Sequence, residues 1–120
     1  MTAAEAIEAV CDAWTRLDND AIAAGFAEDG VFDDPLHERR LVGRDDIRET
    51  NAGAVAALRE CRVTLGHVVE DGDVGIAEGR FRGIDTDGNA MDFPFAMVVE
   101  IRDGEIARMS EYFDTRPLVA

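Results

Sequence analysis

A chain of 120 residues, with 47% apolar and 32% charged residues, is long enough to enclose a hydrophobic core, and we expect a single domain over residues 1–120. The formal net charge of -14 argues against nucleic acid and anionic membrane as partners, because both would repel an acidic surface. No apolar run approaches the roughly 18–20 residues that span a bilayer. No basic segment precedes the first apolar residues, so we expect a cytoplasmic protein without a signal peptide.

The basic residues are all arginine, since the chain has 12 basic residues and no lysine. Strong acidity without lysine favours a halophilic protein, because high salt screens the repulsion between acidic side chains. An alternative is an acidic protein from a GC-rich genome, in which arginine codons replace those of lysine. A loss of folded signal on desalting would support the first interpretation, and a salt-independent melting temperature would exclude it.

The first residues have the pattern of an amphipathic helix. Thr2 and Glu5 have the spacing of a capping box, which marks a helix start. Apolar residues then recur at helical intervals: Ile7, Val10, Cys11, Trp14 and Leu17. A later helix is predicted to begin after Gly43, with acidic residues in its first turn. Its buried side is expected to consist of Ile47, Val55 and Leu58.

Between these two helices the pattern is less regular. Asp18 or Asn19 can cap a second, shorter helix, which we expect to include Phe26 and to end by Gly30. Residues 31–34 directly precede Pro35 and predict only a brief extended segment. Residues 37–41 are strongly charged and predict an exposed loop.

The second half of the chain has the alternation of β-strands. From Glu60 onward apolar residues occupy every second position, and glycines follow aspartates at Gly72, Gly88 and Gly104. These turns predict four successive antiparallel strands, and strands of this length tend to curl. The expected fold is therefore α+β, with helices packed on a curved, mainly antiparallel sheet that is open at one end.

The last predicted hairpin contains an unusual carboxylate. Its first strand has an apolar face made of Phe93, Phe95, Met97, Val99 and Ile101. On its second strand, Glu111 shares a face with Ala107, Met109 and Phe113. A carboxylate in a buried row is unfavourable unless it is paired, protonated or used in chemistry.

The order of these segments carries a resemblance to a known family. The motifs FAEDGVFDDP, GRDDIRE and IRDGEIARMSEYFD, in this order after two helices, resemble the SnoaL-like branch of the nuclear transport factor 2-like superfamily. The resemblance extends over residues 4–118. It implies a cone-shaped roll of about three N-terminal helices on a curved sheet, as in cystatin-like folds, with a deep hydrophobic pocket and a homodimer. This fold hosts isomerases, epoxide hydrolases, polyketide cyclases and non-catalytic binding modules, so the resemblance alone does not define the activity.

Two members of the superfamily allow a comparison by position. Asp34, before Pro35, matches the general base of ketosteroid isomerases, but Val10 and Met97 stand where those enzymes need hydrogen-bond donors. The ending SEYFDTRPL resembles limonene-1,2-epoxide hydrolase and places Glu111 at a catalytic acid position. Glu78 and Arg80 match that enzyme's Arg-x-Asp pair in reversed order, and Phe32 lacks a required hydroxyl. Neither activity is predicted for this chain.

The residues still support acid/base chemistry. Two carboxylates in an apolar pocket differ in pKa if only one of them is paired with an arginine, and the unpaired one can transfer protons near neutral pH. We therefore expect Asp34 to act as base and Glu111 as its acid or electrostatic partner, with Arg80 and Glu78 holding charge nearby. His67 is a further catalytic candidate, because it shares the apolar face of its strand.

Each assignment has a structural alternative. Glu78, Arg80 and Glu111 could form an ion-pair network between strands, Asp34 could cap a turn, and His67 could be a core or rim residue. His37 with its neighbouring acids has no metal-ligand spacing, so we expect neither a metal nor a cofactor. The expected ligand-binding wall is apolar and consists of Trp14, Phe32, Phe93, Phe95, Met97, Met109 and Phe113.

Two classes of function remain open from the sequence. The first is a cofactor-free acid/base enzyme, of isomerase, cyclase or hydrolase type, that acts on a small apolar carbonyl or epoxide compound. The second is a non-catalytic module that binds a hydrophobic ligand or serves as a dimerising scaffold. An unpaired carboxylate facing the pocket would favour the enzyme, and carboxylates neutralised by arginine would favour the scaffold.

Overall fold

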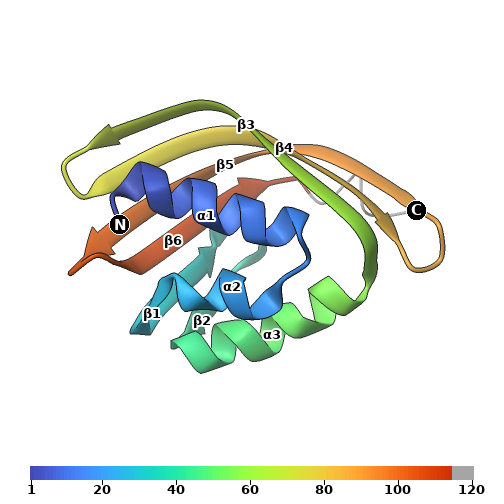
Figure 1. Ribbon diagram of the computed structural model, residues 1–120, viewed down its shortest axis with the longest axis horizontal. Helices are drawn as coiled ribbons and strands as arrows, with labels where there is room; N and C mark the ends of the chain where they lie inside the picture. Colours follow the sequence, from blue (N-terminus) through green and yellow to red (C-terminus); the bar gives the residue numbers. More distant parts are fainter. Residues whose placement is uncertain (115–120) are drawn as a thin grey trace.

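The computed structural model describes residues 1–114 and has three helices on one six-stranded sheet (Figure 1). The helices are α1 (Ala3–Thr15), α2 (Asn19–Ala24) and α3 (Arg44–Ala56). The strands are β1 (Phe26–Asp34), β2 (Arg39–Val42), β3 (Leu58–Asp71), β4 (Val74–Asp85), β5 (Ala90–Arg102) and β6 (Glu105–Phe113). Their order in the sheet is β2-β1-β6-β5-β4-β3, and only β1 and β6 are parallel. The α+β roll predicted from the sequence is confirmed. Within residues 1–114, no helix has the length and apolar character needed to cross a membrane.

Helix α1 lies across the inside of the curved sheet, beneath the long strands β3, β4 and β5 (Figure 1). Its predicted start is confirmed, because Thr2 and Glu5 form both hydrogen bonds of the capping box. Gly75 in β4 allows the helix to pack closely, since a Cβ atom there would lie 2.8 Å from the Cβ atom of Ala3. The first turns of the helix are therefore packed directly against β4.

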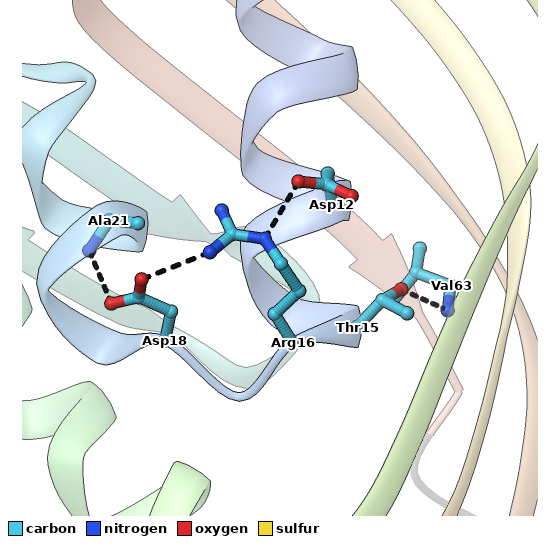
Figure 2. A network of polar contacts seen from close by, with 6 residues as sticks. All are labelled: Asp12, Thr15, Arg16, Asp18, Ala21 and Val63. Carbon is cyan, nitrogen blue, oxygen red and sulfur yellow. Dashed lines mark hydrogen bonds and ion pairs between the residues drawn. The ribbon is translucent and has the colours of Figure 1, made fainter.

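The turn between α1 and α2 is held by a set of polar contacts (Figure 2). Arg16 donates to Asp12 at 2.8 Å and to Asp18 at 3.0 Å. Asp18 in turn caps α2 by accepting from the backbone N–H of Ala21 at 3.1 Å. The hydroxyl oxygen of Thr15 accepts from the backbone N–H of Val63 at 3.0 Å, which ties the end of α1 to β3. These contacts fix the position of the last turn of α1, which lines the cavity described below.

Two expectations for residues 25–42 are wrong. Helix α2 ends at Ala24, and Phe26 begins a nine-residue strand in which Phe26 and Ala27 are buried. The segment expected to be an exposed loop contains β2, in which Leu41 is buried beside Phe32. Strand β1 pairs with β2 and with β6, and β2 pairs with β1. The local sequence pattern does not reveal such pairing between strands.

The predicted meander of four strands is confirmed, and each strand pairs with the next one in sequence. The turn between β5 and β6 has positive φ angles at Asp103 (54°) and Gly104 (77°), as a two-residue hairpin turn requires. The apolar face predicted for β5 is also confirmed in part by burial, since Phe93, Met97 and Val99 are in the core.

Two glycines should respond in opposite ways to replacement by alanine. A Cβ atom on Gly79 in β4 would lie 2.5 Å from the carbonyl oxygen of Thr64 and 2.7 Å from the ring of Phe95. We expect Gly79→Ala to lower the free energy of unfolding by about 1–3 kcal/mol through overpacking. Gly53 in α3 has no atom within 4 Å of its Cβ position, so Gly53→Ala should raise it by about 0.5–1 kcal/mol. Urea denaturation measures the change in the free energy of unfolding for each variant. A change in the same direction in both variants would contradict this packing.

Candidate functional site

The open end of the roll contains a cavity of about 400 Å³. Its helical wall comes from the end of α1 and from one side of α3, and its other wall is the concave face of the sheet. Six of the seven residues predicted for the ligand wall line it: Trp14, Phe32, Phe93, Phe95, Met97 and Phe113. Met109 is the exception and corrects the prediction, because it is packed in the core with Val10 and Val99 and is not among the cavity-lining residues.

Aromatic rings form a continuous row along this cavity. Phe81, Phe93 and Phe113 come from three adjacent strands, and their ring centroids are 5.0 Å and 5.4 Å apart in stacked arrangements. Trp14 meets Phe81 edge-on at 6.5 Å, and His37 lies 5.0 Å from Phe113 at the other end. The sheet wall is therefore largely apolar and aromatic along this row.

Glu111 is one of two acidic residues that line the cavity; the other, Asp85, lies at the end of β4 and accepts a hydrogen bond from Asn89. The carboxylate of Glu111 has neither a hydrogen bond nor an ion pair within residues 1–114, although it lines the cavity. The pKa of Glu111 is raised to about 7, mainly by burial and also by the negative charge of Asp34, while the positive charge of Arg39 acts to lower it. Both the protonated and the ionised form of Glu111 are thus populated near neutral pH.

Asp34 lies beside Glu111 on the neighbouring strand. The strands β1 and β6 are in register with Asp33 opposite Ser110, so the next residues, Asp34 and Glu111, are adjacent on the concave face. Asp34 is buried and hydrogen-bonded to Nδ1 of His37 at 2.7 Å, and Nη2 of Arg39 lies 4.0 Å from its other oxygen. The two carboxylates predicted for the site are therefore close together, with Asp34 partnered and Glu111 free of direct partners among the described residues.

The other three catalytic candidates are not in the cavity. In β4, Ala77, Gly79 and Phe81 face inward, so Glu78 and Arg80 face the outer side of the sheet. Glu78 contacts His67 at 2.7 Å, and the His67 side chain is 90% exposed.

Arg80 pairs with Asp92 at 2.6 Å on the same outer side. The expectation that Arg80 holds charge next to Glu111 is therefore wrong. The alternative network of Glu78, Arg80 and Glu111 is not formed either, because the third residue lies on the opposite face of the sheet.

Arg39, which was expected in an exposed loop, is the cation beside Asp34 and Glu111. It stands directly opposite Asp34 in the pairing of β1 with β2, and its guanidinium lies 6.0 Å from the ring centroid of Phe32. Because β2 was not predicted, the position of Arg39 beside the cavity could not be derived. The charge balance beside Glu111 is therefore set by residues of three neighbouring strands, Asp34, Arg39 and Glu111, and by His37 in the short 3-10 helix Pro35–His37 that follows β1.

The two cysteines do not form a nucleophilic site. Cys11 lines the cavity, but burial raises the pKa of its thiol to about 12, with smaller contributions from Glu111 and Cys61. Burial also raises the pKa of Cys61 to about 11, so neither thiol is ionised near neutral pH. In residues 1–114, no cluster of three or more His, Cys, Asp or Glu side chains has an arrangement suited to a metal ion.

The neighbouring charges predict opposite shifts for Glu111. Asp34→Asn removes a negative charge and should lower the Glu111 pKa below about 7, whereas Arg39→Gln removes a positive charge and should raise it. Carbon-detected NMR titration of the Glu111 side chain measures both values. Asp92→Asn, on the outer face, is the control and should leave the Glu111 pKa unchanged. Shifts of the same sign in the first two variants would contradict the arrangement.

The chain is similar to known proteins in sequence and in fold. The sequence model of the SnoaL-like domain matches residues 7–109. A protein of Catenulispora acidiphila with a ketosteroid isomerase-like fold, crystallised in complex with trimethylamine, is 25% identical, with a TM-score of 0.83 over 95% of this chain and 88% of that chain. TerC, co-crystallised with polyporic acid, is 25% identical, with a TM-score of 0.79 over 92% of this chain and 90% of that one.

An LEH-like epoxide hydrolase of Mycobacterium tuberculosis shares the fold at 23% identity, with a TM-score of 0.81 over 94% of this chain and 83% of that chain. No curated protein sequence matches the chain. The part of the resemblance from Thr115 to Leu118 lies outside the described residues.

Proposed function

The chain belongs to the SnoaL-like domain family, and we propose that it is a cofactor-free acid/base enzyme of isomerase, cyclase or hydrolase type. Its fold is one that binds small molecules, and its neighbours include epoxide hydrolases and cyclases. The proposed substrate is a small apolar carbonyl or epoxide compound. The observation that carries this proposal is Glu111, a carboxyl group without a direct partner among the described residues, with a pKa of about 7 in an apolar cavity.

The proposed chemistry is a proton transfer at the cavity wall. Ionised Glu111 removes a proton from the carbon next to a carbonyl group, and the resulting protonated Glu111 returns that proton to another atom of the same molecule. This proposal exchanges the roles expected from the sequence, because Glu111 and not Asp34 is the base. Asp34 keeps Glu111 basic through its negative charge, and His37 holds Asp34 in place by a hydrogen bond. Arg39 offers a positive charge to the developing oxyanion at the edge of the cavity.

A non-catalytic ligand-binding function is the second candidate, and one observation favours it. Ionised Glu111 and Trp14 line the same cavity, and a negative charge and the face of an aromatic ring both attract organic cations. The similar protein of Catenulispora acidiphila was crystallised with trimethylamine. A binding module of this type would hold an alkylammonium ligand without converting it.

Deuterium exchange separates the two candidates. We expect the wild-type protein to introduce deuterium from D2O next to the carbonyl of small cyclic ketones, or to open small epoxides, and Glu111→Gln to lose this activity. Glu78→Gln is the matched control, because it is the same chemical change on the outer face of the sheet. Binding of trimethylammonium compounds with no turnover of any ketone or epoxide would favour the second candidate and reject the enzyme.

Homodimerisation remains a proposal as well, and the outer face of the sheet supports it. Val69, Ile76 and Tyr112 lie on this face with exposed fractions of 60%, 49% and 38%. Covering such side chains would be favourable, since apolar surface leaves water. Light scattering after size-exclusion chromatography tests it, and a mass of 13.1 kDa at all concentrations would indicate a monomer.

A further inference from the structure

Asn51 is a buried amide without a hydrogen-bond partner in the described part of the chain. It lies on α3, one turn after the fully buried Ile47, and only 8% of its surface is exposed. It lines the cavity together with Thr50 and Ala54 from the same helix. Side-chain amides inside proteins are normally hydrogen-bonded, and the Asn51 amide is not among the fully shielded polar atoms of the described residues, so it is accessible from the cavity.

Packing alone does not explain an asparagine at this position. Its neighbours along the cavity side of α3 are small, and Ile47 shows that this side of the helix accepts aliphatic residues. A leucine has the same branched shape and the same number of side-chain heavy atoms, although its methyl groups are larger, and it would leave no polar atom unpaired. The amide is therefore of use to something that enters the cavity and can donate to it or accept from it.

The opposite wall indicates what kind of molecule would enter. The rings of Phe81, Phe93 and Phe113 stack on one another, so their faces are largely occupied and their edges are directed at the cavity. Ring edges carry partial positive charge and prefer the negative face of another aromatic ring. A flat aromatic molecule lying across this row makes such contacts with all three rings at once.

We propose that Asn51 is a ligand-recognition residue, which hydrogen-bonds a hydroxyl or carbonyl group of a flat aromatic molecule lying on the row of Phe81, Phe93 and Phe113. This inference rests on the proposal that the cavity takes a small molecule, and it adds the chemical class of that molecule. It also places the polar group of the ligand at the helical wall, whereas Glu111 acts from the sheet wall.

Three probes test separately the hydrogen bond to Asn51 and the preference for a flat aromatic ligand. The first, 2-naphthol, is flat and carries a hydroxyl; naphthalene is flat without one; and 2-decalol has the hydroxyl on a puckered saturated frame. We expect the wild-type protein to bind 2-naphthol about tenfold more tightly than naphthalene, the effect of one buried hydrogen bond. We also expect it to bind 2-naphthol more tightly than 2-decalol. NMR chemical-shift titration of the full chain gives the dissociation constants.

The variants then assign the hydroxyl contact. Asn51→Leu should bind 2-naphthol and naphthalene equally, keep its preference over 2-decalol, and unfold at no lower urea concentration than wild type. Asn51→Ala, which only shortens the side chain, should show the same loss of preference. Thr50→Val and Glu111→Gln should retain the preference for 2-naphthol over naphthalene.

Several outcomes would overturn the inference. They are equal binding of 2-naphthol and naphthalene by wild type, binding of none of the probes, or a preference that disappears in Thr50→Val or Glu111→Gln but persists in Asn51→Leu. Tighter binding of 2-decalol would reject the aromatic ligand. The acid/base proposal is tested separately by the titration of Glu111 in the ligand-free protein, so failure of one can be distinguished from failure of the other.

Discussion

Glu111→Gln is expected to be more stable than the wild-type protein at pH 8, by about 3 kcal/mol, and equally stable at pH 4. The reason is that the pKa of Glu111 is about 7 in the folded protein and near 4.5 in the unfolded chain. Between these two pH values the unfolded chain has released the proton and the folded protein still holds it. The stability that Glu111 contributes is therefore complete below pH 4.5 and is lost as the pH rises to about 7.

The measurement is urea denaturation of both proteins from pH 4 to 8.5 at constant salt. The quantity to compare is the difference in unfolding free energy between variant and wild type, because the many other acids affect both proteins equally. Glu78→Gln is the matched control and should show no such pH dependence, since Glu78 lies on the outer face beside His67. A difference for Glu111→Gln that stays constant with pH would show that Glu111 is not desolvated.

Loss of turnover is the second large effect that we expect. A positioned general base contributes about 10²–10⁴-fold to a proton transfer, so Glu111→Gln should lower kcat by this factor on any ketone that the wild-type protein converts. Wild-type activity should rise with pH and reach a plateau above about pH 7, as Glu111 loses its proton. Asp34→Asn should move this transition to lower pH, because it removes the negative charge that raises the Glu111 pKa.

The pH profile distinguishes catalysis from a purely structural role of these residues. A structural defect lowers the activity at all pH values, whereas the proposed roles shift the midpoint of the profile. An unchanged midpoint in Asp34→Asn, or full activity of Glu111→Gln, would contradict the assignment of Glu111 as the base. Reduced activity in Glu78→Gln would contradict the placement of the site.

Local sequence patterns were sufficient where the structure depends on local chemistry. The capping box of Thr2 and Glu5, the hairpin turn at Asp103 and Gly104, and the alternation along β5 all follow from short-range rules, and the structure confirms them. The same alternation drew attention to Glu111, because it was the single carboxylate in an apolar row. Its environment is the part of the site that could be anticipated from the sequence.

The residues around Glu111 could not be anticipated, because they depend on pairing between distant strands. Arg39 is beside the cavity only because β2 pairs with β1, and β2 was not predicted. Arg80 was assigned to the wrong face, since the alternation of β4 fixes which residues share a face but does not show which face is inside. Asn51 had a detectable signal, because it lies four residues after Ile47 on the buried side of a helix.

The most direct test of the account is the NMR titration of Glu111 in the ligand-free protein, with Glu111→Gln used to assign its side-chain carbon signal. We expect a single carboxylate signal that titrates near pH 7, is absent from the spectrum of Glu111→Gln, and titrates at lower pH in Asp34→Asn. A Glu111 signal that titrates near its ordinary value of 4.5 would show that the cavity does not desolvate this group, and the acid/base function would be rejected.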